Sequence, residues 1–292
     1  MAAAITAPGT PAPFRQLIVN CDDFGSALCA NAGVEKALND GIATSATVMV
    51  PCPWAYDAVQ RALAHPRWAI GVHLTHTAEW PRYRWRPLLA RDRVPGLYGP
   101  DGFMWPSTRD VHAHATADEA LAEGAAQIEQ ALAFGLRPTH IDSHMGVMQL
   151  DPRFYEAYLG LAERYRLPLR MAGARQLAAA VATAPWAADV RRQAQAKGLR
   201  FTDDLQAGPP HAGPQDSHDA LRTQLDALGA GTTEMFFHPC VDTPDLAAMI
   251  PSGGRDRVRD LQLLTDPQLP KALEAKGIHL TSYRDVAPGG AG

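Results

Sequence analysis

Apolar, β-branched runs alternate with helical patterns along nearly the whole chain of 292 residues. Strands are predicted at 17–21, 44–50, 68–74, 138–143, 167–171, 233–237 and 278–281. Helices are predicted at 31–40, 54–64, 117–134, 152–165 and 260–275. Strands that alternate with helices favour a parallel sheet, and about seven such units in one domain favour a barrel. We therefore expect an α/β fold, specifically a TIM-like (β/α) barrel that is seven-stranded or distorted.

The domain organisation follows from the segments that break this alternation. Residues 1–13 are rich in Ala, Pro and Thr, without a basic start or an apolar core, which predicts a disordered leader and not a signal peptide. We expect a single barrel domain at 14–288. Within it, 75–116 is long and rich in Pro, Arg, Trp and Gly, and we expect this insertion to be functional and to cap the barrel. The Gly/Pro/His-rich stretch at 205–217 is predicted to be a lid or a surface loop.

Composition excludes several classes of function. Lys and Arg number 27 against 31 Asp and Glu, a formal net charge of -4, and there is no basic tract for nucleic acid. No run of about 18 apolar residues is present, so we expect no membrane span. We expect a cytoplasmic protein and, by base rate, a homodimer. Reduced, buried thiols are predicted for the four cysteines, whose spacing fits no metal or redox motif: Cys21, Cys29, Cys52 and Cys240.

Polar clusters stand at the ends of three predicted strands. They are Asp22-Asp23, Gly71-Val72-His73-Leu74 and Thr139-His140-Ile141-Asp142-Ser143-His144. The chemistry of a barrel lies at the carboxyl ends of its strands, where these clusters fall. Ionisable groups brought together there are costly unless they bind something. The clusters therefore indicate a catalytic site for a divalent metal.

Alternation along a strand divides the roles within these clusters. Asp22 and Asp23 should point apart, which favours one metal ligand and one proton-transfer group. His140, Asp142 and His144 should share a face if their strand persists. One carboxylate with two imidazoles forms a three-ligand set that suits Zn²⁺ or another first-row ion. The imidazoles favour Zn²⁺ over Mg²⁺, which prefers oxygen ligands.

Other residues near the predicted mouth of the barrel can each be interpreted in two ways. His238 follows a strand and suits a general acid, or it is structural. Arg170 could hold a carboxylate in place or form a surface salt bridge. In the long loop, Trp80, Arg84 and Trp85 suit stacking on a sugar, or the tryptophans anchor the loop to the barrel.

The motifs together resemble one known family. Asn20-Cys21-Asp22-Asp23-Phe24-Gly25 with Asn31, Gly71-Val72-His73-Leu74-Thr75, Thr139-His140-Ile141-Asp142-Ser143-His144 and His238-Pro239 resemble the YdjC-like carbohydrate deacetylases, which include the chitooligosaccharide deacetylases. The resemblance runs from about Arg15 to Val286. It implies a TIM-like barrel related to the polysaccharide deacetylases, and metal-dependent N-deacetylation of acetylated sugars.

The resemblance also implies a role for each site residue. Three residues match the metal ligands: Asp23, His73 and His144. Asp22 matches the catalytic base, Arg170 an arginine that steadies it, and His238 the His-Pro element. His140 is the weaker match for a ligand, and we expect it to contact substrate with the loop residues. The chain departs from the family at His76, where an apolar residue is common.

The expected function is hydrolysis of the N-acetyl group of a sugar or oligosaccharide by water that one divalent metal activates. The expected partner is a small carbohydrate, with neither nucleic acid nor membrane. Two alternatives stay open at this point. The same barrel could carry a metallohydrolase for another amide, an ester or a phosphoester, or it could be a non-catalytic sugar-binding barrel.

Overall fold

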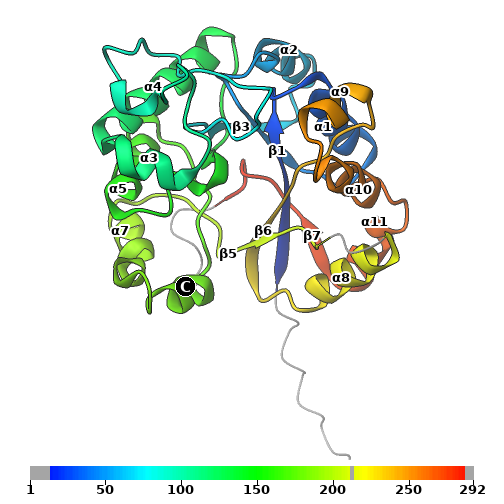
Figure 1. Ribbon diagram of the computed structural model, residues 1–292. Helices are drawn as coiled ribbons and strands as arrows, with labels where there is room; N and C mark the ends of the chain where they lie inside the picture. Colours follow the sequence, from blue (N-terminus) through cyan, green and yellow to red (C-terminus); the bar gives the residue numbers. More distant parts are fainter. Residues whose placement is uncertain (1–13, 211–213, 287–292) are drawn as a thin grey trace, which may run out of the picture.

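The computed structural model describes residues 14–210 and 214–286, with the side chains of 214–216 left aside. The predicted leader at 1–13 lies outside the described residues. In Figure 1 the first strand runs through the middle of the molecule, with α3, α4 and α5 on one side and α1, α2 and α10 on the other.

Seven strands of the described residues form one parallel sheet. They are β1 Arg15–Phe24, β2 Ser45–Val48, β3 Ala69–Leu74, β4 Ile141–Ser143, β5 Asp204–Ala207, β6 Gly231–Phe237 and β7 Ile278–Leu280. The order along the sheet is β4-β3-β2-β1-β6-β5. β6 pairs with β1 from Arg15 to Cys21, so β7 and β2 share the opposite edge of β1, β7 at its start and β2 further along.

The barrel is open between β4 and β5. A strand predicted at 167–171 would have filled this gap, but only Leu169 bridges there, to Ile141 on one side and Phe201 on the other. The sheet is therefore a curved, partly open barrel. The prediction of a TIM-like barrel is confirmed in this coarser form, because the barrel is open and not fully closed.

Helices connect the strands and cover the sheet. They are α1 Leu28–Asp40, α2 Ala55–Ala64, α3 Thr108–His114, α4 Ala117–Ala133, α5 Pro152–Tyr165, α6 Ala174–Ala180, α7 Val190–Ala196, α8 Pro214–Asp226, α9 Pro244–Met249, α10 Gly254–Leu264 and α11 Leu269–Ala275. Three 3₁₀ turns complete the described elements: η1 Pro95–Leu97, η2 His144–Gly146 and η3 Pro185–Asp189. None of the helices in the described ranges is long and apolar enough to cross a membrane.

Local signals account for the helices that the sequence predicted well. The helix predicted at 152–165 is confirmed to the residue, because Asp151 caps its start and Pro152 occupies its first turn. The helix at 117–134 begins with a capping box of Thr116 and Glu119. The segment 260–275, predicted to be mostly helix, is mostly helical, but the chain breaks after Leu264 and two helices share the segment.

The second irregular segment also differs from its prediction. A lid or loop was expected at 205–217, but β5 includes 205–207 and α8 begins at Pro214. Residues 211–213 between them lie outside the described residues. Much of this segment is therefore part of the α/β framework.

The insertion at 75–116 is ordered by contacts with α4. Glu123 is buried on α4 and accepts hydrogen bonds from the backbone N–H groups of Leu88 and Leu89 at 2.9 and 3.0 Å. Glu119 accepts one from Gly96 at 2.6 Å. Buried carboxylates that accept backbone donors satisfy groups a loop would otherwise leave unpaired. The loop is thus held against the barrel wall.

The core lies between the sheet and its helices, and all four cysteines are buried in it as free thiols, as predicted. β1, β2 and β3 are buried on both faces over most of their length, which explains their continuous apolar sequences. The polar groups of this core gather where β1, β3 and β4 end.

Candidate functional site

A bulge at the end of β1 brings both aspartates to the mouth of the barrel. Between Cys21 and Phe24, β1 advances three residues while β2 advances two, from Ala46 to Val48. Asp23 takes the left-handed backbone conformation, with φ of 65°. An extra residue in a strand bends it and redirects its side chains. The expectation that neighbouring aspartates point apart is therefore wrong here.

Gly25 and Asn31 stabilise this bend. Gly25 has φ of 86°, and a Cβ there would lie 2.9 Å from the Cα of Ala55, so only glycine fits. Its N–H donates to Oδ1 of Asn31 at 2.7 Å. Asn31 in turn donates to the carbonyl of Trp54 at 3.1 Å. The motif thus joins the end of β1 to α1 and α2 and holds the aspartates in place.

Three ligand atoms converge at the mouth, as the metal assignment requires. Asp23 Oδ1 lies 3.4 Å from His73 Nε2 and 3.3 Å from His144 Nδ1, and these two nitrogens are 3.3 Å apart. All three side chains are buried. Asp23 Oδ1 accepts no hydrogen bond from any described residue in spite of that burial. A buried orphan oxygen facing two imidazole nitrogens fits a divalent cation with mixed N and O ligands.

The far nitrogen of each ligand histidine faces a carboxylate. His73 Nδ1 lies 2.6 Å from Asp142 Oδ1, and His144 Nε2 lies 3.0 Å from Glu79 Oε2. A ring N–H that donates to a carboxylate leaves the other nitrogen with a lone pair for a metal. This arrangement would orient both imidazoles as ligands of a metal ion.

Electrostatics at the two rings follow from the same contacts. Burial lowers the pKa of His73, but Asp142 and Asp22 outweigh it and raise the pKa to about 10. Burial likewise lowers the pKa of His144, while Glu79 and Asp23 raise it to about 9. A metal binds neutral imidazole, so metal binding at neutral pH would release protons from these rings.

Asp22 is held as a charged carboxylate. Arg170 donates to Oδ2 at 2.7 Å and to Oδ1 at 2.6 Å, a bidentate pair. Burial raises the pKa of Asp22, but the attraction and hydrogen bonds of Arg170 outweigh it and hold the pKa well below its ordinary value. The same guanidinium contacts Glu234 Oε1 at 2.8 Å and Asp142 Oδ2 at 3.0 Å. Asp22 is therefore ionised at neutral pH, beside the ligand set.

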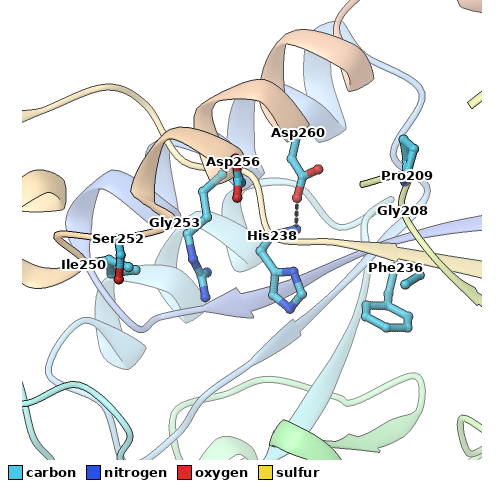
Figure 2. A pocket seen from close by; sticks show the side chains of 11 residues that line it. Gly208, Pro209, Phe236, His238, Ile250, Ser252, Gly253, Asp256 and Asp260 are labelled. Atoms are coloured by element: carbon cyan, nitrogen blue, oxygen red, sulfur yellow. Dashed lines mark hydrogen bonds between the residues drawn. The ribbon is translucent and has the colours of Figure 1, made fainter. Parts of the chain in front are cut away.

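His238 lies near the same carboxylate. Its Nε2 lies 4.0 Å from Asp22 Oδ2, and 35% of its side chain is exposed against 2% for His73. Asp260 accepts the backbone N–H of His238 at 2.8 Å, as Figure 2 shows. Burial lowers the pKa of the ring. His238 thus has both access to solvent and a position next to the candidate base.

A cavity of about 340 Å³ opens beside these groups. Figure 2 shows Phe236, His238, Asp256 and Asp260 around it. Arg257 also lines it and donates to Asp23 Oδ2 at 2.7 Å. Two residues of its lining lie next to the aspartates, His238 beside Asp22 and Arg257 beside Asp23, which makes the cavity the candidate binding space for a ligand.

Several residues predicted to contact substrate lie elsewhere. His140 is fully buried and stacks on Tyr283, with ring centroids 3.8 Å apart. His140 lies just before β4, which spans only Ile141–Ser143, and His144 begins η2, so no strand carries these histidines on one face. The prediction that His140 touches metal or substrate is therefore wrong.

The loop residues follow the alternative interpretation, in which they anchor the loop. Trp85 is 3% exposed and donates from Nε1 to the carbonyl of Thr77 at 2.8 Å. Arg84 donates to the carbonyl of Met104 at 2.6 Å and pairs with Asp101 at 3.1 Å. Trp80 is 7% exposed and packs in the same apolar cluster as Trp85. These buried or paired side chains offer no open face to a sugar, contrary to the prediction.

Four residues of the site were missed by the sequence analysis. They are Glu79, Glu234, Arg257 and, as the partner of His73, Asp142. Asp142 had a usable signal, because it stands inside the His-x-Asp-Ser-His motif. The others stand in segments with no local pattern that marks them, and only the fold brings them to the mouth.

Comparison with known proteins places the chain in a family. A family model described as YdjC-like protein matches residues 16–275. The chain belongs to this family. A carbohydrate deacetylase of Geobacillus stearothermophilus is 33% identical, over 93% of this chain and 98% of that protein. A chitooligosaccharide deacetylase of Yersinia enterocolitica is 30% identical, over 93% of this chain and 99% of that protein.

A solved structure agrees with this membership. A protein of Enterococcus faecalis V583, described provisionally as a cellobiose-phosphate cleavage protein, superposes with a TM-score of 0.77. It is 28% identical, and the match covers 92% of this chain and 97% of that one. The resemblance drawn from the motifs alone is confirmed by these comparisons.

Proposed function

We propose that this chain is a metal-dependent carbohydrate deacetylase, which hydrolyses the N-acetyl group of an acetylated sugar or oligosaccharide. The observation that carries the proposal is the convergence of Asp23 Oδ1, His73 Nε2 and His144 Nδ1, each within 3.4 Å of the next. Relatives at 30–33% identity over 93% of the chain are named as deacetylases of carbohydrates or chitooligosaccharides. Site and family thus support the same chemistry.

Asp23, His73 and His144 would hold the cation. When bound, a divalent cation lowers the pKa of a coordinated water and polarises the carbonyl of the scissile amide. Two imidazoles beside a single carboxylate favour Zn²⁺, while Mg²⁺ prefers a shell of oxygens. One Zn²⁺ per chain is the assignment that this donor set supports best.

The remaining groups of the site move protons and hold charge. Asp22 accepts a proton from the attacking water, and Arg170 keeps this carboxylate ionised and oriented. The water oxygen forms a bond to the carbonyl carbon, and the C–N bond then breaks to release acetate. His238 delivers a proton to the leaving amine from the edge of the cavity. Burial lowers the pKa of this ring, so it is neutral at neutral pH and first takes up the proton that Asp22 removed from the water, since its Nε2 lies 4.0 Å from Asp22 Oδ2.

The substrate side of the proposal rests on the cavity. A ligand in this cavity would contact Phe236 and His238, and His238 Nε2 lies 4.0 Å from Asp22 Oδ2. An aromatic ring at such a wall suits the apolar face of a sugar. A small carbohydrate is therefore the proposed partner, while the homodimer and the cytoplasmic location stay predictions from the sequence.

Acetate release tests the proposal directly. The protein is stripped with a chelator, loaded with Zn²⁺, Mg²⁺ or another divalent ion, and offered acetylated mono- and oligosaccharides. We expect acetate only in the loaded protein. A parallel screen with phosphorylated sugars and simple esters covers the other metallohydrolase reactions, and turnover there without acetate release would replace the proposal.

Asp22→Asn tests the assignment of the base. The variant keeps its shape but loses a proton acceptor, so we expect turnover to fall by on the order of 10²–10⁴-fold. Zn²⁺ content should stay at the level of the unmodified chain, because Asp22 is outside the three-ligand set. Turnover that stays within about threefold of the unmodified chain would remove Asp22 from the mechanism.

A further inference from the structure

Two consecutive residues of the long loop contact the surroundings of two different metal ligands. Glu79 Oε2 lies 3.0 Å from His144 Nε2, and the Glu79 side chain is 21% exposed. Trp80 lies under the guanidinium of Arg257, whose carbon is 5.4 Å from the ring centroid. Arg257 in turn donates to Asp23 Oδ2 at 2.7 Å. We infer that Glu79 and Trp80 form a clamp that positions the metal ligands His144 and Asp23 for metal binding.

The Glu79 half of the clamp selects which nitrogen of His144 faces the metal. A carboxylate at Nε2 keeps the proton on that nitrogen. The lone pair then belongs to Nδ1, which lies 3.3 Å from Asp23 Oδ1 and 3.3 Å from His73 Nε2. Without Glu79 the ring could take the other tautomer, in which Nδ1 carries a hydrogen and cannot bind a cation.

The Trp80 half acts on Asp23 through Arg257. The guanidinium occupies Asp23 Oδ2, so Oδ1 alone is left to face the imidazoles. A cation over an aromatic face within about 6 Å of the centroid is attracted to it, and Trp provides the strongest such face. Trp80 therefore fixes Arg257, which makes Asp23 a ligand through one oxygen.

The loop itself is tied down around the clamp, so its residues can act as fixed supports. Tyr83 donates from its hydroxyl to the carbonyl of Ser26 at 2.6 Å, which joins the loop to the turn after β1. Trp85 donates to the carbonyl of Thr77 at 2.8 Å, across the base of the segment. Residues that orient metal ligands must themselves be held in place by packing and hydrogen bonds.

Metal affinity measures the clamp without recourse to catalysis. The inference rests on the proposed function, so the unmodified chain and His73→Ala are titrated first, as stripped proteins, with Zn²⁺ against a chromophoric chelator. Tight binding by the unmodified chain that His73→Ala loses establishes the site. If both bind equally, or neither binds, the proposed site and its clamp are both overturned.

Glu79→Ala is then compared with the unmodified chain. We expect its Zn²⁺ affinity to fall by about 10–100-fold, the usual loss when an outer carboxylate of a ligand histidine is removed. Glu79→Gln should fall less, because its amide oxygen still accepts the Nε2 hydrogen. The visible spectrum of the Co²⁺ form should change with Glu79→Ala, since the ligand geometry around the ion changes.

Glu119→Gln is the matched control. Glu119 anchors the same loop through Gly96 but has no contact with a metal ligand among the described residues. We expect its Zn²⁺ affinity to stay within about twofold of the unmodified chain. A Glu79→Ala affinity within that same range, in protein that melts normally, overturns the clamp while leaving the metal site intact. If Glu79→Ala folds poorly, an unchanged affinity and Co²⁺ spectrum in Glu79→Gln overturn it instead.

Discussion

Four buried histidines fall into two pairs that the protein treats in opposite ways. His73 and His144 each direct one ring nitrogen at a carboxylate, and their pKa values are raised to about 10 and 9. His76 and His140 are equally buried, yet they meet a backbone carbonyl, a threonine hydroxyl and a tyrosine ring. Their pKa values are lowered by burial to about 4 and 3. We refer to them as the ligand pair and the core pair.

The contrast separates burial from function. Burial disfavours the charged imidazole in both pairs, and only the carboxylates around the ligand pair reverse its effect. The core pair also shows an orphan nitrogen on each ring, Nδ1 of His76 and Nε2 of His140. Neither ring belongs to a group of potential ligands in the described chain. A buried histidine is therefore a site residue only where other ligand atoms and an outer carboxylate meet it.

The largest expected effect comes from removing one member of the ligand pair. His73→Ala deletes a proposed ligand and removes the imidazole from between Asp23 and Asp142, which keep their arginine partners, Arg257 and Arg170. We expect Zn²⁺ affinity and acetate release to fall by more than the roughly 10–100-fold that loss of an outer residue causes. Metal content after dialysis and initial rates of acetate release measure the two losses.

His76→Gln is the control for that substitution. It removes a buried imidazole that lies three residues after His73 but belongs to the core pair. We expect full metal content and rates within about threefold of the unmodified chain, with the cost appearing as lost stability. If His76→Gln loses its metal as His73→Ala does, the division into two pairs has no functional meaning.

The structure brings the two histidines of the proposed ligand pair together, as their motifs predicted, but the sequence did not predict their surroundings. His73 and His144 stand in motifs at strand ends, and parallel strands bring their carboxyl ends to one mouth. His140 stands in the same motif as His144 and was assigned to the same face. The strand is too short for that assignment, since it ends at Ser143 and His144 starts a 3₁₀ turn. The spacing of four residues between His140 and His144 does not indicate where the strand ends.

Other misses have the same physical origin in long-range contacts. Glu79 meets His144 across 65 positions, and Arg257 meets Asp23 across 234. β5, Asp204–Ala207, has only partly buried or exposed residues and no β-branched side chain, so its sequence carries no strand pattern. The bulge in β1 depends on the pairing of β1 with β2. It therefore could not be predicted from Asp22 and Asp23 alone.

An intermediate effect is expected from making one ligand histidine resemble the core pair. Asp142→Asn removes the negative charge at His73 Nδ1 but keeps an oxygen that can accept its hydrogen. We expect Zn²⁺ affinity to fall by about 10–100-fold, because the carboxylate no longer raises the basicity of the ring. Competition titration with a chelator measures the affinity, as for the clamp variants.

Thr47→Val serves as the control for Asp142→Asn. It removes the hydrogen bond that Thr47 donates to Asp142 Oδ2 at 2.8 Å, together with the longer contacts of its hydroxyl to Asn20 and His73, without touching the charge. We expect a loss of about 1 kcal/mol in the free energy of unfolding and a smaller change in metal affinity. Equal losses of metal affinity in the two variants would mean that packing around Asp142, and not its charge, supports His73.

The smallest expected effect on activity lies in the core pair, whose contribution appears instead in the pH dependence of stability. The pKa of His140 is lowered from 6.5 to about 3 by burial. Below pH 6.5 the unfolded chain binds a proton that the folded chain excludes. The stability contributed by neutral His140 is therefore complete above pH 6.5 and is lost as pH falls towards 3. The slope approaches about 1.4 kcal/mol per pH unit in this window.

His140→Phe should remove this pH-dependent contribution to stability and still keep a ring against Tyr283. The ring centroids of His140 and Tyr283 are 3.8 Å apart in the unmodified chain. Melting temperatures of both proteins between pH 5 and 7 provide the test, because other groups titrate alike in the two and cancel in the difference. We expect the variant to lose less stability on acidification and to keep its metal and its rate of acetate release. An equally steep loss would mean that His140 is protonated in the fold. A loss of metal would mean that His140 belongs with the ligand pair. The two pairs are equally buried, so what distinguishes them is the charge that their rings can carry.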